Sequence, residues 1–300
     1  MNTLATSASD VPSSGTLGAA GASRSGAPGT AGARPDRHIP QLVGHRGAAA
    51  LVPENTLLSF RRGIADGAVL LECDVHLSAD GRDAIIHDAT IDRTAQPDSP
   101  LRTGSVAELT REQLDRVRVG MDQRIPTLTE VLDVAVGEGG TRIPLLVEVK
   151  AAAATALVMQ TLTAYFRDQD FAERASAPAM VISFHPEVLQ EARAVAPHIP
   201  RLLTTTETSE QFFTTAVELD VAQIGVRIAD ARQADVERAR QLGIELNLWT
   251  ARSEEELHRA LELGCDTITV DDPRWAREII TGAGSPDAGL PGRESERIGA

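Results

Sequence analysis

The chain is poor in aromatic residues, in cysteine and in positive charge. Aromatic residues make up 3% of its 300 residues and hydrophobic residues 42%, so a core must be built from Ala, Leu, Val and Ile. Two cysteines, Cys73 and Cys265, are too few for a disulfide framework, and we expect buried free thiols. Lys and Arg number 29 against 43 Asp and Glu, a net charge of -14. This acidity argues against a nucleic-acid backbone or anionic lipid as the main partner, although a local cation can still bind a small anion.

Long apolar runs are also missing. No segment reaches the about 18 consecutive apolar residues that a membrane span requires. The N-terminal segment lacks the basic and apolar regions of a secretory signal. From these absences we expect a cytoplasmic protein with no stable membrane insertion, and the oligomeric state stays open.

Composition divides the chain into three parts. Residues 1–36 are rich in Ser, Gly, Ala, Thr and Pro, and they predict a disordered N-terminal tail. Residues 283–300 predict a flexible C-terminal tail for the same reason. The segment between them, 37–282, is close in length to a (β/α)8 barrel and predicts a single domain of that kind.

Short β-rich runs alternate with amphipathic helical runs through this domain. Strands are predicted at residues 41–46, 69–75, 144–149, 179–184, 200–205, 222–228, 245–250 and 267–271. Helices are predicted at 55–66, 127–136, 155–168, 186–195, 209–219, 232–242, 253–263 and 273–281. Eight strand–helix pairs are what a closed TIM barrel needs. An open doubly wound sheet is the alternative, but its usual Gly-rich phosphate turn after the first strand is absent.

The alternation is interrupted once, after the second predicted strand. An apolar piece, 84–86, is followed by His87 and Asp88, then by a stretch rich in turn residues and a predicted helix over 106–117. We therefore predict a small insertion, at about residues 89–125, over the mouth of the barrel.

Polar side chains recur at the ends of the predicted strands. Residues i and i+2 of a strand share a face, and barrel active sites lie at the carboxyl ends of the strands. Such pairs are Glu72 with Asp74, Glu148 with Lys150, Ser183 with His185, Asn247 with Trp249, and Thr269 with Asp271. So many polar residues at one end of a Val, Leu and Ile sheet predict an active site.

Three carboxylates are candidate metal ligands. Glu72 and Asp74 share a strand face, and Glu148 would complete the set. Ligands that are all oxygen favour Ca²⁺ or Mg²⁺ over Zn²⁺. A salt bridge with Arg or Lys at the barrel mouth is the structural alternative.

Two histidines are candidates for acid–base catalysis. Phosphodiester cleavage requires one proton to be removed and another delivered, and His45 and His87 are suited to both tasks near neutral pH. A single His at a strand end is more often a structural hydrogen-bonding group, but two beside carboxylates favour catalysis.

Three further side chains are candidates for contact with the substrate. Arg46 can bind a phosphate oxygen through its planar guanidinium, with a surface ion pair as the alternative. Lys150 either adds positive charge beside the phosphate or neutralises Glu148, and Trp249 either lines the pocket or fills the core.

The order and spacing of these motifs over about residues 40–280 resemble the glycerophosphodiester phosphodiesterases, a family similar in fold to the phosphatidylinositol-specific phospholipases C. The motifs are His45-Arg46-Gly47, Pro53-Glu54-Asn55-Thr56, Glu72-Cys73-Asp74, His87-Asp88, Arg93-Thr94, Pro126-Thr127-Leu128 with Glu130, Glu148-Val149-Lys150, Ser183-Phe184, Trp249-Thr250, and Thr269 before Asp271-Asp272-Pro273.

The resemblance implies a TIM barrel with an insertion after its second strand. It also implies His45 and His87 as the acid–base pair, and Arg46 and Lys150 facing the phosphate. Glu72, Asp74 and Glu148 would ligate Ca²⁺ or Mg²⁺. The implied substrates are small glycerophosphodiesters, which yield glycerol 3-phosphate and an alcohol.

Two segments depart from the usual family pattern, residues 95–98 after Arg93-Thr94 and residues 48–52 after Gly47. Both are expected at the substrate rim, so the sequence does not predict the preferred head group. Two alternative functions also stay open. One is a phospholipase C- or D-like enzyme that acts on intact or lyso-phospholipid, and the other is a non-catalytic barrel that binds phosphate esters.

Overall fold

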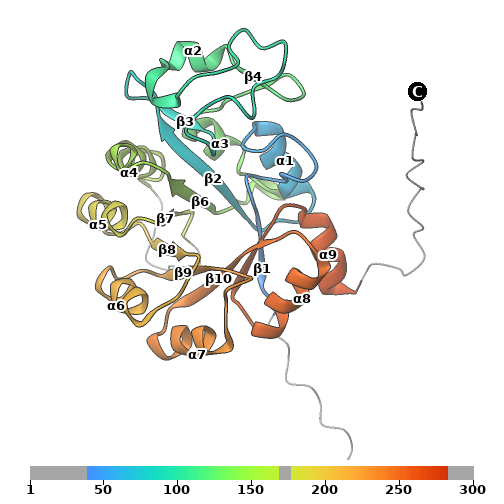
Figure 1. Cartoon of the computed structure of the whole chain (residues 1–300), viewed down its shortest axis with the longest axis vertical. Coiled ribbons are helices and arrows are strands. Elements are labelled where there is room, and N and C mark those ends of the chain that lie inside the picture. The colour runs from blue at the N-terminus through green and yellow to red at the C-terminus, as the bar shows by residue number, and fades with distance from the viewer. Residues whose placement is uncertain (1–38, 169–176, 283–300) are drawn as a thin grey trace, which may run out of the picture. The chain divides into compact units, whose positions relative to one another are not determined.

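The computed structural model describes residues 39–168 and 177–282, and the predicted tails lie outside them. Eight parallel strands of the described residues form a closed barrel in chain order, because each pairs with the next and the last pairs with the first (Figure 1). These strands are β1 (Gln41–Gly44), β2 (Leu70–Leu77), β6 (Leu145–Val149), β7 (Ala179–Ser183), β8 (Arg201–Thr205), β9 (Gln223–Arg227), β10 (Glu245–Ala251) and β11 (Thr267–Val270). The predicted TIM barrel is confirmed.

A helix follows each barrel strand. These helices are α1 (Leu57–Ala65), α3 (Leu128–Val134), α4 (Thr155–Tyr165), α5 (Pro186–Val195), α6 (Glu210–Glu218), α7 (Gln233–Leu242), α8 (Glu254–Leu263) and α9 (Pro273–Thr281). Several of these helices begin at a residue that caps the N-terminus. The side chains of Thr56, Ser253 and Asp272 each accept a hydrogen bond from a backbone N–H of the first turn. In the described part of the chain, no helix is both long and apolar enough to cross a membrane.

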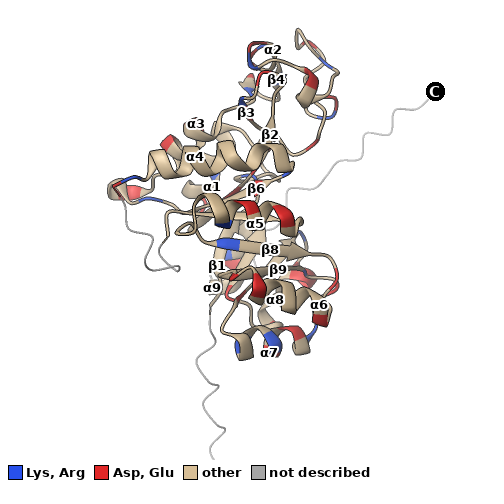
Figure 2. Ribbon diagram, turned by 90° about the vertical axis from the view of Figure 1, so that its left-hand side faces the viewer, with Lys and Arg blue, Asp and Glu red and all other residues tan. Residues whose placement is uncertain are grey.

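Side chains alternate along the strands, so one face of each strand packs against the helices and the other faces the barrel interior. On β2, Leu71, Cys73 and Val75 belong to the main hydrophobic core that the strands share with the helices, whereas Glu72 and Asp74 face the barrel interior. Both cysteines are buried free thiols, as predicted. Among the largest fully buried side chains of the described residues, Phe60 is the one aromatic, so the core is aliphatic. Charged residues gather on outer helices such as α5, α6 and α7 (Figure 2).

The first strand is shorter than predicted. It ends at Gly44, so His45 and Arg46 belong to the turn that follows and not to a strand over 41–46. The chain leaves the extended conformation there because Arg46 and Gly47 have φ values of 50° and 91°. The two functional candidates are therefore held by a tight turn.

The insertion after β2 differs from its prediction. The single helix predicted over 106–117 is wrong: a 3₁₀ turn, Val106–Glu108, is followed by a separate short helix, α2 (Arg111–Asp115). The break occurs because Leu109 is extended and Thr110 starts a new helix through a capping box with Gln113. Three short strands were also not predicted: β3 (Asp83–Ile85), antiparallel to β2, and the pair β4 (Arg118–Val119) and β5 (Gln123–Arg124).

The insertion has a small core of its own. Eight buried residues form it, namely Ala84, Ile86, Ile91, Val106, Leu114, Val117, Val119 and Ile125. Arg111 ties it together by donating hydrogen bonds to the carbonyls of Asp83 and Ile125. At the turn between β4 and β5, Gly120 lies so close to Pro53 that a β-carbon there would meet the proline ring at 2.4 Å. The insertion therefore packs on the loop that carries His45 and Arg46 toward α1.

Candidate active site

A pocket opens at the carboxyl ends of the strands. Seven of the eight predicted site residues line it: His45, Arg46, Glu72, His87, Glu148, Lys150 and Trp249. The eighth, Asp74, is 1% exposed and contacts the ammonium group of Lys150. Strand register explains part of this convergence, because Asp74 lies opposite Glu148 in the β2–β6 pair. The structure thus brings together every residue that the sequence predicted for the site.

The turn after β1 is built around its backbone groups. The N–H of Arg46 donates to Glu72 Oε2 at 2.9 Å, and the Arg46 carbonyl accepts from the Ser59 hydroxyl at 2.7 Å. Asn55, which tolerates its left-handed φ of 55°, donates from its side chain to Asp74 Oδ2 at 2.7 Å. These bonds fix the first and second strand ends relative to each other.

Gly47→Ala is expected to lower the free energy of unfolding by about 2–4 kcal/mol, because left-handed strain and overpacking add. The φ of Gly47 is +91°, and a β-carbon would lie 2.4 Å from the backbone carbonyl carbon of Ser59 in α1. Urea denaturation measures the change. Gly81→Ala is the matched control, since Gly81 has a φ of +72° but nothing within 4 Å of the added carbon. Equal losses in the two variants would show that the close contact has no effect.

Three carboxylates form the acidic part of the site. One oxygen from each of Glu72, Asp74 and Glu148 lies within 4.8 Å of the others. Burial and the charges of its two neighbours raise the pKa of Glu72 well above its usual range. Burial and the charge of Asp74 likewise raise the pKa of Glu148. Such shifts mean that a negative charge on Glu72 or Glu148 is disfavoured in this buried cluster.

Two cations contact this cluster. Lys150 Nζ lies 2.7 Å from Glu148 Oε1 and 3.1 Å from Asp74 Oδ1, and Arg46 Nε lies 3.2 Å from Asp74 Oδ2. Burial alone would raise the pKa of Asp74, but Lys150 and Arg46 outweigh it and hold that pKa below the usual range. Both alternatives for Lys150 are therefore compatible with the geometry, since it neutralises Glu148 while lining the pocket.

The donor set fits a hard divalent cation. Glu72 Oε1 is buried and has no hydrogen-bond donor among the described residues. An unpaired buried carboxylate oxygen is costly unless a cation or donor satisfies it. The ligands are oxygen atoms, and one oxygen from each carboxylate can contact a single divalent cation. Glu72, Asp74 and Glu148 can therefore hold such an ion.

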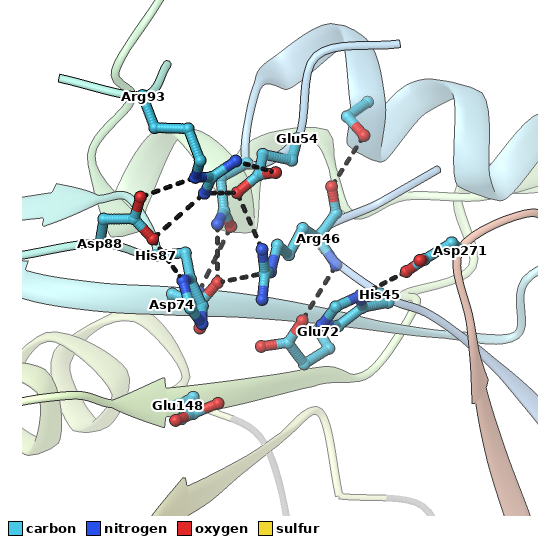
Figure 3. Close-up of polar contacts among 12 residues, drawn as sticks. His45, Arg46, Glu54, Glu72, Asp74, His87, Asp88, Arg93, Glu148 and Asp271 are labelled. Carbon is cyan, nitrogen blue, oxygen red and sulfur yellow. Dashed lines mark hydrogen bonds and ion pairs between the residues drawn. The ribbon is translucent and has the colours of Figure 1, made fainter. Parts of the chain in front are cut away.

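Each of the two histidines is held by an aspartate. His45 Nδ1 lies 2.5 Å from Asp271 Oδ1, and His87 Nδ1 lies 2.7 Å from Asp88 Oδ1. Figure 3 shows the two imidazoles on either side of Arg46, each directed toward its own carboxylate. Because a carboxylate accepts, each Nδ1 is assigned as the protonated nitrogen, which leaves each Nε2 available for proton transfer.

Glu54 connects Arg46 to the insertion. It accepts from Arg46 Nη1 at 2.8 Å, and from Arg93 Nη1 and Nη2 at 2.9 and 2.7 Å (Figure 3). Arg93 in turn donates from Nε to Asp88 Oδ2 at 2.7 Å. Hydrogen bonds from Arg93 and His87 outweigh partial burial and lower the pKa of Asp88. The insertion therefore contributes to holding both Arg46 and His87.

The pocket wall formed by β7, β8, β10 and β11 is mostly uncharged. Phe184 packs edge to face against Trp249, with ring centroids 5.5 Å apart and planes at 87°. Thr204, Asn247 and Thr269 also line this wall. The indole N–H of Trp249 is buried and has no acceptor among the described residues. Trp249 thus lines the pocket.

Some residues around the site were not predicted as site residues. Asp88, Asp271, Glu54 and Arg93 occur in the motifs noted above, but none was given a role. The sequence does hold a signal for the two aspartates. Asp88 directly follows the candidate His87, and Asp271 forms a polar i, i+2 pair with Thr269 at the end of the last predicted strand. Arg252 lines the pocket and donates to Asp271, and no pattern in the sequence pointed to it.

A closed parallel barrel with carboxylates, cations and two imidazoles at its carboxyl-end mouth has the architecture of a TIM-barrel enzyme. Comparison with known proteins narrows this class. The model of the glycerophosphoryl diester phosphodiesterase family matches residues 45–274. A glycerophosphodiester phosphodiesterase of Caldanaerobacter subterraneus is 27% identical over 251 residues, which cover 81% of this chain and 98% of that protein. One from Bacillus subtilis is 26% identical over 266 residues, covering 83% and 88%.

A solved structure is similar as well. A phosphodiesterase of Oleispira antarctica, in complex with the product sn-glycerol-3-phosphate, aligns with a TM-score of 0.70 at 23% identity and covers 81% of this chain and 97% of that one. The chain belongs to the glycerophosphoryl diester phosphodiesterase family and is an enzyme of that family.

Proposed function

We propose that the protein hydrolyses small glycerophosphodiesters to glycerol 3-phosphate and an alcohol with the help of a divalent cation. The observation that carries the proposal is the convergence of three carboxylates, two aspartate-held imidazoles and two cations at the mouth of the barrel, where all but Asp74 line one pocket. The product named in the Oleispira antarctica complex, sn-glycerol-3-phosphate, fits the same chemistry.

Arg46 and Lys150 are the proposed phosphate-binding residues. Both groups line the pocket, and acidic partners hold their pKa values above the usual ranges despite burial. Both therefore stay positively charged at neutral pH and can bind the phosphate oxygens. A cation held by Glu72, Asp74 and Glu148 would withdraw further charge from the phosphate as a Lewis acid.

The two histidines are the proposed acid and base. With Nδ1 of each ring bonded to an aspartate, Nε2 of the neutral ring accepts a proton from the attacking O–H group. The other ring starts protonated at both nitrogens, donates its Nε2 proton to the departing oxygen and becomes neutral. The attacking group is either the glycerol 2-hydroxyl, which gives a cyclic phosphate, or a water molecule. Detection of a cyclic phosphate by ³¹P NMR would identify the hydroxyl as the nucleophile.

The protein is expected to release glycerol 3-phosphate from at least one of glycerophosphocholine, glycerophosphoethanolamine and glycerophosphoglycerol. Chelation should abolish turnover, and adding back Ca²⁺ or Mg²⁺ separately would identify the preferred ion. Released glycerol 3-phosphate is quantified with a coupled dehydrogenase assay.

The same panel includes a lysophospholipid and phosphatidylinositol as controls. Turnover of those lipids alone would favour a phospholipase-like enzyme. Metal binding without turnover of any phosphodiester would instead favour a binding protein, and either result would contradict the proposal.

A further inference from the structure

The two imidazoles are supported by parallel chains of hydrogen bonds. In the first, Arg252 Nε donates to Asp271 Oδ2 at 2.6 Å, and Asp271 Oδ1 accepts from His45. In the second, Arg93 Nε donates to Asp88 Oδ2 at 2.7 Å, and Asp88 Oδ1 accepts from His87. Arg93 Nη2 also donates to Asp88 Oδ1 at 3.2 Å, whereas Asp271 divides its two oxygens between one imidazole and one guanidinium.

This division fixes the orientation of the carboxylate. The backbone around Asp271 is already held, since His45 N–H donates to the Val270 carbonyl and Ala50 N–H donates to the Asp271 carbonyl, both at 3.0 Å. The side chain of Asp271 could still rotate about its own torsion angles, and Arg252 restricts that rotation by binding the second oxygen. Although burial raises the pKa of Asp271, the bonds and charges of His45 and Arg252 lower it below the usual range.

The two arginines differ in how many groups they hold. Arg93 also binds Glu54, and Glu54 binds Arg46. Removal of Arg93 would therefore disturb Arg46, a proposed phosphate-binding residue, as well as His87. The guanidinium of Arg252 has Asp271 as its one hydrogen-bond partner among the described residues. Its side chain is 57% exposed, so it contributes little to the packing of the barrel.

We propose that Arg252 is a positioning residue for His45 and acts through Asp271. It keeps the Asp271 carboxylate oriented to accept the hydrogen bond from His45 Nδ1–H, so that Nε2 of His45 is directed at the substrate. The inference rests on the proposed function, because His45 must transfer a proton for its orientation to matter. A positioning role predicts a lower kcat with little change in KM, whereas direct contact with substrate would raise KM.

Kinetics on the glycerophosphodiester that the wild-type protein hydrolyses best will test this. Arg252→Gln and Arg252→Ala are each expected to lower kcat about tenfold, the lower end of the range for residues that orient a functional side chain without touching the substrate, with KM changed less than twofold. Asp271→Asn is expected to lose at least about a hundredfold, since it can stabilise the wrong His45 tautomer. Because all three act on one group, Arg252→Gln should add less than twofold in the Asp271→Asn or His45→Ala background.

Arg227→Gln is the matched control. Arg227 ends β9, its side chain is 49% exposed and it pairs with Asp230, but it does not line the pocket. Its kcat should equal that of the wild type. Unchanged kcat in both Arg252 variants, a rise confined to KM, or full additivity with Asp271→Asn would overturn the inference. If the wild-type protein hydrolyses no glycerophosphodiester, it is the proposed function that fails.

Discussion

His45→Ala and His87→Ala are each expected to lower kcat by at least about a hundredfold while leaving the barrel folded. General acid–base catalysis contributes about 10²–10⁴ in rate, which corresponds to about 3–5 kcal/mol of the barrier. Each ring is positioned by an aspartate at 2.5 or 2.7 Å, a contact that a surface histidine without a function would not need. Neither ring belongs to the hydrophobic core, so stability should change little.

Steady-state kinetics on the best glycerophosphodiester, with circular dichroism and thermal melts alongside, provide the measurement. His258→Ala is the matched control, because His258 lies on the exposed face of α8. It should keep wild-type turnover. Turnover within threefold of the wild type in either site variant would remove that histidine from the mechanism. If the variant loses activity together with its helical circular dichroism signal, the histidine is needed for folding and not for proton transfer.

The barrel was predictable because its local rules agree with one another. A strand buried on both faces, such as β7, is an apolar run up to its final Ser183. Side chains that cap helix N-termini mark where the helices begin. The prediction failed where the local sequence pattern conflicts with tertiary contacts. The helical pattern over 106–117 is broken by the extended Leu109, which packs against the small core of the insertion.

The site was predictable to the extent that it lies on strands. Alternation places Glu72 and Asp74 on one face, and the common direction of parallel strands brings Glu148 to the same rim. The partners of the histidines follow no such rule. His45 and Asp271 are 226 residues apart, and Arg252 reaches Asp271 from the loop after another strand. Only the closure of the barrel, which pairs β11 with β1, makes them neighbours.

Glu72→Gln is expected to abolish most of the activity and, without metal, to stabilise the protein at neutral pH. Burial beside Asp74 and Glu148 raises the pKa of Glu72 well above its ordinary value of 4.5. A carboxyl group with a raised pKa stabilises the fold fully below its unfolded pKa, and this contribution is lost as pH rises through the folded pKa. Metal-free wild-type protein should therefore lose stability as pH rises above the ordinary glutamate pKa of 4.5, whereas the glutamine variant, which has no charge to bury, should lose less.

Thermal melts with chelator, and with Ca²⁺ or Mg²⁺, measure both effects. At about pH 8 without metal, Glu72→Gln should melt at least about 3 °C above the wild type, since a gain of about 1 kcal/mol raises Tm by that order in a domain of this size. Added metal should raise the wild-type Tm by mass action and the variant Tm much less. Glu237→Gln, on the exposed face of α7, is the control and should match the wild type throughout. A glutamine variant with normal turnover, or one that gains as much stability from metal as the wild type, would show that the buried, unpaired oxygen of Glu72 is not a metal ligand.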